Sequence, residues 1–230
     1  MKKTNILLLG ALILALNPTA QAAEKWTTLF DGKKVTGLRG YGQKGFPENG
    51  WKVENGTLKT IPRSKGGQPR DLATDINLTD FEFECEWKVS PGGNSGIMYR
   101  VLEQKKPAYV TGPELQVLDD ERHKDGKIRF PLRTAGSLYE LIGKGMKDKP
   151  YNQAGQWNKV RIVFKDNNVQ HWLNDAKIVE YTWGSDEIKT LINKSKFKGW
   201  KGFMQQPKGH IVIQHHGEEV WYRAIRVRKL

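Results

Sequence analysis

Short segments in which apolar and polar residues alternate recur along most of the chain. The clearest covers residues 81–89, where every odd position is apolar and every even position is charged. A period of two places successive side chains on opposite faces of a β-strand. The pattern therefore predicts a strand that buries its odd positions and turns its charged positions to water. Cys85 falls on the buried side, where a cysteine acts as a small apolar residue rather than a nucleophile.

Further strand patterns follow at similar spacing, separated by short runs of glycine, proline, asparagine and aspartate. They cover residues 50–61, 95–102, 113–118, 157–165, 168–173, 178–182, 209–215 and 221–229. The Lys-Asp-Asn-Asn turn at residues 165–168 predicts a hairpin, and residues 186–193 predict one short helix. The whole pattern predicts an all-β jelly roll or β-sandwich of two antiparallel sheets, with at most one or two short helices.

The first 23 residues have the layout of a targeting segment. Lys2 and Lys3 precede an apolar run over residues 6–16, and Ala-Gln-Ala at residues 20–22 forms a cleavage pattern. This layout predicts a signal peptide over residues 1–23 and a periplasmic or secreted mature protein. An uncleaved membrane anchor is the alternative, although the run is shorter than a membrane-spanning helix needs. No cysteine follows the run, which argues against a lipoprotein anchor.

Composition and motif content narrow the classes of function. The single cysteine excludes an internal disulfide and a cysteine-rich metal site. The formal net charge is +13, but the lysines are scattered through loops, so we expect no nucleic-acid partner. The chain contains no phosphate-binding glycine loop, no Gly-x-Ser-x-Gly and no His-Glu-x-x-His. Residues 24–230 contain neither a linker nor a second apolar segment of membrane length, so we expect one domain without a membrane span.

Polar residues occupy the face that alternation turns away from the core in three of the predicted strands. Glu114 and Gln116 alternate with apolar residues in one strand, and Gln214 and His216 have matching parity in another. Arg100 lies in the third predicted strand, where alternation places it on the same face as Gly96 and Met98. If these strands are neighbours in one sheet, the five side chains line a hollow of the size of a sugar. The alternative is a sheet face that is merely solvated.

Six motifs occur in order along the mature chain. They are residues 26–32 (Trp-Thr-Thr-Leu-Phe-Asp-Gly), 50–51 (Gly-Trp), 94–100 (Asn-Ser-Gly-Ile-Met-Tyr-Arg), 114–119 (Glu-Leu-Gln-Val-Leu-Asp), 157–158 (Trp-Asn) and 214–223, which starts Gln-His-His-Gly. Together they resemble the 3-keto-disaccharide hydrolase domain, which is common in secreted bacterial proteins. The resemblance implies a concanavalin A-like jelly-roll fold. Two departures, Gly112-Pro113 and the loop 144–151, concern substrate preference more than the fold.

The resemblance implies an enzyme that cleaves 3-keto-glycosides, including 3-keto-disaccharides. A ketone at C3 acidifies the hydrogen on C2, so the group on C1 can leave by elimination and water can then add. Such chemistry needs a base near C2, a donor for the enolate oxygen and an acid for the departing oxygen. We expect His216 to transfer the proton and Arg100 to bind the enolate oxygen. Glu114 is the alternative base, or the group that orients His216.

Further residues are assigned to binding a small carbohydrate substrate. Gln116, Gln214 and Asp119 would bind hydroxyl groups or a divalent metal ion, and Tyr139 and Trp172 would stack on a sugar ring. A divalent metal held by Glu114 and His216 is chemically reasonable, although no ligand spacing in the sequence demands one. No other cofactor is indicated, and nothing in the sequence indicates an oligomeric state.

Two other classes of function remain open. A non-catalytic carbohydrate-binding module of the same fold would need an aromatic, amide-rich site without an arginine and an imidazole. An ordinary two-carboxylate glycoside hydrolase would need a second acid about 5–10 Å from Glu114. The chain shows no run of carboxylates at fixed offsets, and Asp119, the nearby candidate, has the opposite parity. We expect His123, His171 and His215 to be structural.

Overall fold

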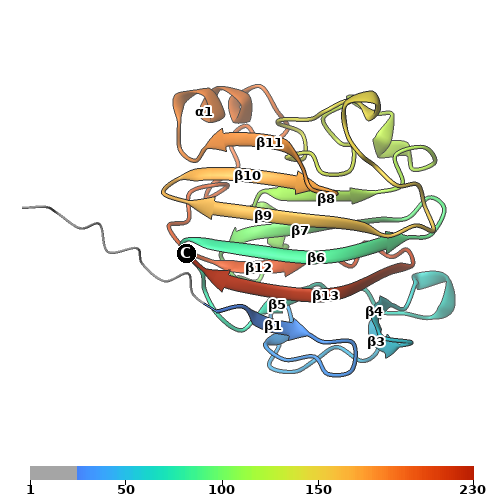
Figure 1. Cartoon of the computed structure of the whole chain (residues 1–230). Coiled ribbons are helices and arrows are strands. Elements are labelled where there is room, and N and C mark those ends of the chain that lie inside the picture. The colour runs from blue at the N-terminus through green and yellow to red at the C-terminus, as the bar shows by residue number, and fades with distance from the viewer. Residues whose placement is uncertain (1–24) are drawn as a thin grey trace, which may run out of the picture.

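The computed structural model describes residues 25–230, and the predicted signal peptide over residues 1–23 lies outside them. Two antiparallel sheets stack on each other, and the described part of the chain contains one α-helix, α1 (Asp186–Asn193) (Figure 1). The predicted all-β sandwich of two antiparallel sheets is therefore confirmed. The helix has the predicted bounds, and the Ser185 hydroxyl caps it by accepting the backbone N–H of Ile188 at 3.3 Å.

The larger sheet has eight strands in the order β11-β10-β9-β6-β13-β4-β3, with β1 paired to β13 beside this path. Its strands are β1 (Thr27–Phe30), β3 (Trp51–Glu54), β4 (Thr57–Thr60), β6 (Phe81–Val89), β9 (Asn158–Lys165), β10 (Asn168–Leu173), β11 (Ala176–Thr182) and β13 (Val220–Lys229). Because β13 pairs with both β1 and β6, the two ends of the domain lie side by side in the sheet.

The smaller sheet has five strands in the order β2-β5-β12-β7-β8. They are β2 (Leu38–Gly40), β5 (Leu72–Thr74), β7 (Asn94–Val101), β8 (Glu114–Leu118) and β12 (His210–Ile213). Short 3₁₀ turns lie in the connecting loops: η1 (Arg63–Lys65), η2 (Ala108–Val110), η3 (Lys124–Gly126) and η4 (Met146–Asp148). The three strands that the polar-face argument joined, β7, β8 and β12, are indeed neighbours.

The core lies between the sheets and contains large aromatic side chains. The bulkiest fully buried ones include Trp51, Trp87, Tyr99, Tyr222 and Phe164. Burial of this much apolar surface is the main stabilising contribution to a domain of this size. Cys85 is buried among these residues, as the alternation predicts. Within residues 25–230, no helix is both long and apolar enough to cross a bilayer.

The charged positions of β6 differ from the prediction. Glu82 and Glu84 lie on the outward face, but only 5% and 8% of their surfaces are exposed. Arg228 and Arg226 of the neighbouring strand β13 cover them and donate hydrogen bonds to their carboxylates. The expectation that these glutamates face open water is therefore wrong, because cross-strand ion pairs shield them.

Candidate active site

A small pocket lies on the face of the smaller sheet that is turned away from the larger sheet. In β8, Leu115 and Val117 point into the core, so Glu114 and Gln116 lie on the opposite face. Loops that follow β8 and α1 close over this face and leave a pocket of about 180 Å³. Its lining is Asn94, Tyr109, Gly112, Glu114, Gln116, Asp125, Tyr139, Lys196, Phe197, Phe203, Gln214 and His216.

Glu114 lies at the start of β8, opposite β7, and its carboxyl rests over Gly96. A Cβ atom at position 96 would be 1.8 Å from Glu114 Oε1, so the carboxyl needs a glycine there. Within residues 25–230, no hydrogen bond or ion pair reaches this carboxyl. Burial raises the pKa of Glu114 to about 8, although the positive charges of Lys196 and His216 oppose the shift. Glu114 is therefore mostly protonated at neutral pH.

Amide side chains form the floor beside Glu114. Gln116 is almost fully buried, and its Oε1 accepts the Val117 N–H at 3.1 Å, which leaves its NH₂ group facing the pocket. Asn94 Oδ1 is buried and has no hydrogen-bond partner among the residues described. Gln214 lines the pocket from the end of β12. A buried hydrogen-bond acceptor without a partner costs folding free energy, and a ligand hydroxyl group could donate the missing hydrogen bond.

The opposite wall combines an aromatic ring with charged groups. The Tyr139 hydroxyl donates a hydrogen bond to Asp125 Oδ2 at 3.2 Å. The Lys196 ammonium lies 4.3 Å from the centre of the Tyr139 ring, and burial lowers the pKa of Lys196. Phe197 and Phe203 stack with ring centres 4.0 Å apart and form the apolar part of the wall. The pocket thus contains both acceptor groups and a positive charge.

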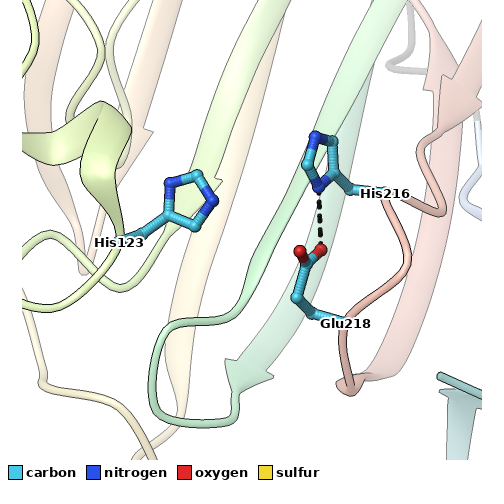
Figure 2. A group of neighbouring side chains, drawn as sticks. All are labelled: His123, His216 and Glu218. Carbon is cyan, nitrogen blue, oxygen red and sulfur yellow. Dashed lines mark hydrogen bonds and ion pairs between the residues drawn. The ribbon is translucent and has the colours of Figure 1, made fainter. Parts of the chain in front are cut away.

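His216 borders the pocket just beyond β12 and is held by a carboxylate. Its Nδ1 lies 2.8 Å from Glu218 Oε2, and this hydrogen bond raises the pKa of His216 (Figure 2). The bond directs the Nδ1 proton toward Glu218 and leaves Nε2 as the free ring nitrogen. The ring of His123 approaches from the loop after β8, with its centre 6.0 Å from that of His216. Glu218 therefore orients the imidazole at the mouth of the pocket.

These three side chains form the one group within residues 25–230 whose geometry approaches that of a metal site. One ligand atom from each of His123, His216 and Glu218 lies within 4.8 Å of the other two. Glu114, the metal ligand considered from the sequence, is not in this group. The Asp125 N–H donates to His123 Nδ1 at 3.2 Å, so a neutral His123 ring has its proton on Nε2. That tautomer opposes coordination through Nε2, since a metal needs a free lone pair.

Arg100 does not join the pocket, and this part of the sequence prediction is wrong. Met98 pairs with Val212 and Val101 pairs with His210, so β7 has one residue more than β12 between these pairs. The bulge gives Arg100 a positive φ of 48° and reverses its direction. Its guanidinium lies between the sheets, 3.5 Å from the centre of the Phe164 ring, and donates to the Thr79 carbonyl. Arg100 is therefore a buried residue with a structural role.

Asp119 and Trp172 also lie away from the pocket, contrary to the prediction that they bind substrate. Asp119 is completely buried, and its carboxylate accepts the Gly92 N–H at 2.7 Å and the Glu121 N–H at 3.2 Å. It stabilises two turns. Trp172 lies on the outward face of the larger sheet, with the Arg161 guanidinium 4.3 Å from its ring centre. The alternation of β10 places it there, on the far side of the sandwich.

Several pocket residues were not recognised as site residues from the sequence. Asn94 was noted within a motif but received no role, and Glu218 was noted only as part of the last motif. Asp125, Lys196 and His123 lie in loops, where no periodicity predicts the direction of a side chain. The structure places the first two in the lining and His123 beside His216. His171 and His215 are buried and hydrogen-bonded to backbone carbonyls.

A second, larger hollow lies on the same outward face, over β2 and the start of β5. It has a volume of about 1020 Å³ and is an open groove whose lining includes five basic residues: Arg39, Lys44, Arg70, Lys105 and Lys106. Its carboxylates already have partners, since Arg39 donates two hydrogen bonds to Glu103 and the His215 N–H donates to Asp71. The smaller pocket, which contains an unpaired carboxyl and an oriented imidazole, is the better candidate for catalysis.

Residues 25–228 match the family described as the 3-keto-alpha-glucoside-1,2-lyase-like domain. The chain belongs to this family. The resemblance noted from the motifs is therefore confirmed. A relative from Bacteroides thetaiotaomicron, named 3-keto-disaccharide hydrolase, is 35% identical over 235 residues, which cover 90% of this chain and 79% of the relative. Together these findings support a carbohydrate-active enzyme of the hydrolase class.

Solved structures agree on the fold. A candidate glycosyl hydrolase from Parabacteroides distasonis has a TM-score of 0.76 and 28% identity, covering 89% of this chain and 94% of its own. The carbohydrate-binding module CBM66 from Bacillus subtilis has a TM-score of 0.50 at 10% identity, covering 92% of this chain and 100% of its own. The second likeness concerns the fold alone. With the two-sheet topology, these likenesses confirm the predicted jelly-roll sandwich.

Proposed function

We propose that this protein cleaves glycosides bearing a ketone at C3, by elimination across C1–C2 followed by addition of water. The supporting observation is that one small pocket contains two proton-transfer groups, a carboxyl and an oriented imidazole. Glu114 has a half-buried carboxyl with a raised pKa and no partner among the residues described, whereas the imidazole of His216 is oriented by Glu218. Glu114 can donate a proton below about pH 8, and His216 can accept one at Nε2 once its imidazole is neutral, so the pocket holds both an acid and a base. The family membership supports the choice of substrate.

His216 is the proposed base. Its Nδ1 proton is bound by Glu218, so Nε2 presents a lone pair that can remove the hydrogen from C2. The carboxylate of Glu218 stabilises the imidazolium that forms, as a third group does in other catalytic constellations. The ketone at C3 is required because it spreads the negative charge left on C2 onto the ketone oxygen. A glycoside with a hydroxyl at C3 offers no such stabilisation.

Glu114 is the proposed acid for the departing oxygen. Its carboxyl retains its proton at neutral pH, and no partner within residues 25–230 competes for that proton. In the elimination, the C2–H and C1–O bonds break, a C1=C2 double bond forms, and Glu114 protonates the leaving group. The enzyme is then left with an ionised Glu114 and a protonated His216.

The same two groups suit the second half of the reaction. The Glu114 carboxylate takes a proton from water, the hydroxide adds to C1, and the His216 imidazolium returns a proton to C2. Both residues recover their starting states, and the net result is hydrolysis of the glycosidic bond. The sequence of steps needs no third proton carrier, in agreement with the small size of the pocket.

Lys196 takes the place that the sequence assigned to Arg100. Its ammonium lies in the pocket and lowers the pKa of Glu114 through its charge, so it is close to the reacting groups. A positive charge in a site that excludes water stabilises a developing enolate strongly. The amide groups of Gln116 and Asn94 provide further contacts to sugar oxygens. Tyr139 provides an aromatic surface for the ring.

The deciding experiment compares a 3-keto-glucoside with the matching unoxidised glucoside. The proposal expects release of the leaving group from the ketone alone, and loss of this activity in His216→Ala with an unchanged circular dichroism spectrum. Equal turnover of both substrates would instead favour an ordinary glycosidase that uses Glu114 with Asp125, the second carboxylate in the lining. Binding without turnover of either substrate would favour a carbohydrate-binding module. Treatment with a chelator tests the divalent metal considered from the sequence, since the proposed steps need none.

A further inference from the structure

The larger groove differs from the catalytic pocket in its charge balance. Arg39 is neutralised by Glu103, to which it donates hydrogen bonds of 2.6 and 2.8 Å. The basic side chains that remain are Lys44, Arg70, Lys105 and Lys106. All four are exposed, and none forms an ion pair with any of residues 25–230. The remaining carboxylate is Asp71, so the lining has an excess of positive charge.

The loop that presents two of these lysines is held in place. The Tyr41 hydroxyl lies 3.3 Å from the Leu102 carbonyl and 3.2 Å from the Lys106 carbonyl, and it accepts the Gln104 N–H at 3.1 Å. Glu103 additionally accepts the Gly42 N–H at 2.6 Å. These bonds connect the loop after β7 to the loop after β2, and both loops line the groove. The positive charges are thus displayed on a preorganised rim, which lowers the entropic cost of binding.

The groove also adjoins the catalytic pocket. Asp71 lines the groove and accepts the backbone N–H of His215, which lies between the pocket residues Gln214 and His216. The negative charge of Asp71 acts on Glu114 as well. Arg70 precedes Asp71 and is anchored by its carbonyl, which accepts the Trp51 Nε1–H at 2.6 Å. The Arg70 side chain lies against Gly40 of β2 and lines the groove beside Asp71.

We propose that the basic groove binds the leaving group of the substrate and selects leaving groups that bear a negative charge. This inference rests on the proposed function. The pocket of about 180 Å³ suits one sugar ring, while the groove of about 1020 Å³ has room for a larger group on C1. Carboxylate, phosphate and sulfate share the chemistry that Arg70 and the lysines recognise. Arg70 can bind such a group through two parallel hydrogen bonds.

The test uses two 3-keto-glucosides that differ in the charge of the leaving group, 4-carboxyphenyl and 4-carbamoylphenyl. We expect kcat/KM to be about tenfold higher for the anionic substrate at low ionic strength, with the advantage shrinking in 0.5 M salt because exposed charges are screened. Arg70→Gln should remove most of this advantage and leave the neutral substrate unaffected. Lys33→Gln, which alters an exposed lysine outside the groove, should change neither rate. A second pair of substrates with phosphate and uronate leaving groups distinguishes the natural anion.

An equal kcat/KM for the two substrates in the wild-type protein would overturn the proposal, as would an equal loss for both in Arg70→Gln. If neither 3-keto-glucoside reacts, the proposed function is wrong, but anion binding by the groove can still be tested separately. Calorimetry with the inert, unoxidised 4-carboxyphenyl and 4-carbamoylphenyl glucosides then decides. Tighter binding of the anion that is lost in Arg70→Gln supports an anion-binding groove, and equal binding rejects it.

Discussion

The outward faces of the two sheets both present glutamates, but the larger sheet pairs those of β6 with arginines, whereas the smaller sheet presents Glu114 without a partner among the residues described. On the larger sheet, Arg226 donates to Glu84 at 2.5 Å and Arg223 donates to Glu86 at 2.7 Å. Their guanidinium groups lie over tryptophan rings, including that of Trp157 at 4.2 Å. On the smaller sheet, the Glu114 carboxyl has no such partner among the residues described. The same residue type is structural in one place and chemically available in the other.

The presence or absence of an arginine partner decides whether a glutamate stabilises the fold or is available to react. A carboxylate held by an arginine is fixed in position, and its oxygens are occupied by hydrogen bonds. The half-buried Glu114 carboxyl, whose pKa desolvation raises, retains its proton up to about pH 8 and costs folding free energy when it ionises. The Glu114 carboxyl is therefore available for proton transfer but lowers the local stability of the fold. The glutamate–arginine ion pairs on the larger sheet stabilise the fold but are not available for proton transfer.

The largest effect should come from Glu114→Gln. Removal of the acid should lower kcat/KM on a 3-keto-glucoside about 1,000-fold, because general acid catalysis contributes roughly 10²–10⁴-fold. Glu84→Gln is the matched change on the other face, and it should leave kcat/KM within about twofold while lowering the free energy of unfolding by about 1 kcal/mol. Steady-state kinetics and urea denaturation measure both. Similar activity losses in the two variants would remove the distinction.

Gly96→Ala should reduce kcat/KM about 100-fold, because the new Cβ atom would occupy the position of Glu114 Oε1. The end of a glutamate side chain can rotate away, so the protein should stay folded with its acid displaced. Gly45→Ala is the control, since open space surrounds that position. Full activity in Gly96→Ala would show that the position of the carboxyl over residue 96 is not needed.

Glu218→Gln should lower kcat about 30-fold, because the amide no longer stabilises an imidazolium on His216. Since the bond to Glu218 raises the pKa of His216, the acidic limb of the pH–rate profile should also move to lower pH. Glu219→Gln, at the next position and paired with Lys59, is the matched control and should leave the profile unchanged. A loss of rate without a shift of the limb would indicate a merely structural role for Glu218.

The smallest effect is the shape of the wild-type pH profile. The rate should rise as His216 loses its proton above pH 6.5 and fall as Glu114 loses its own near pH 8. The charges that face Glu114 are Lys196 and His216, which lower its pKa, and Asp71 and Asp125, which raise it. Lys196→Met should therefore move the basic limb upward, and Lys198→Met should not. A flat profile from pH 6 to 9 would contradict the assignment.

Alternation predicted the long strands well because each buries one face over many residues. The bounds of β6, β10 and the helix α1 agree with the prediction. The short strands β1, β2 and β5 were missed, since three or four residues cannot establish a period and their pairing comes from distant segments.

The site was predictable only where strand parity holds. Glu114 and Gln116 lie in β8, Gln214 and His216 keep the strand parity just beyond β12, and the structure brings all four to one pocket with Tyr139. Arg100 failed because a one-residue bulge reverses a side chain without a local sequence signal. Lys196 and His123 reach the site from loops, where tertiary packing alone sets direction.

The most direct test of the account is exchange of the C2 hydrogen of 3-keto-glucose with solvent deuterium, followed by proton nuclear magnetic resonance. The wild-type protein should accelerate the loss of the C2 signal, glucose itself should not exchange, and His216→Ala should exchange at the uncatalysed rate. A wild-type protein that leaves the C2 hydrogen in place, or a His216→Ala protein that exchanges it as fast, would contradict abstraction of this proton by His216.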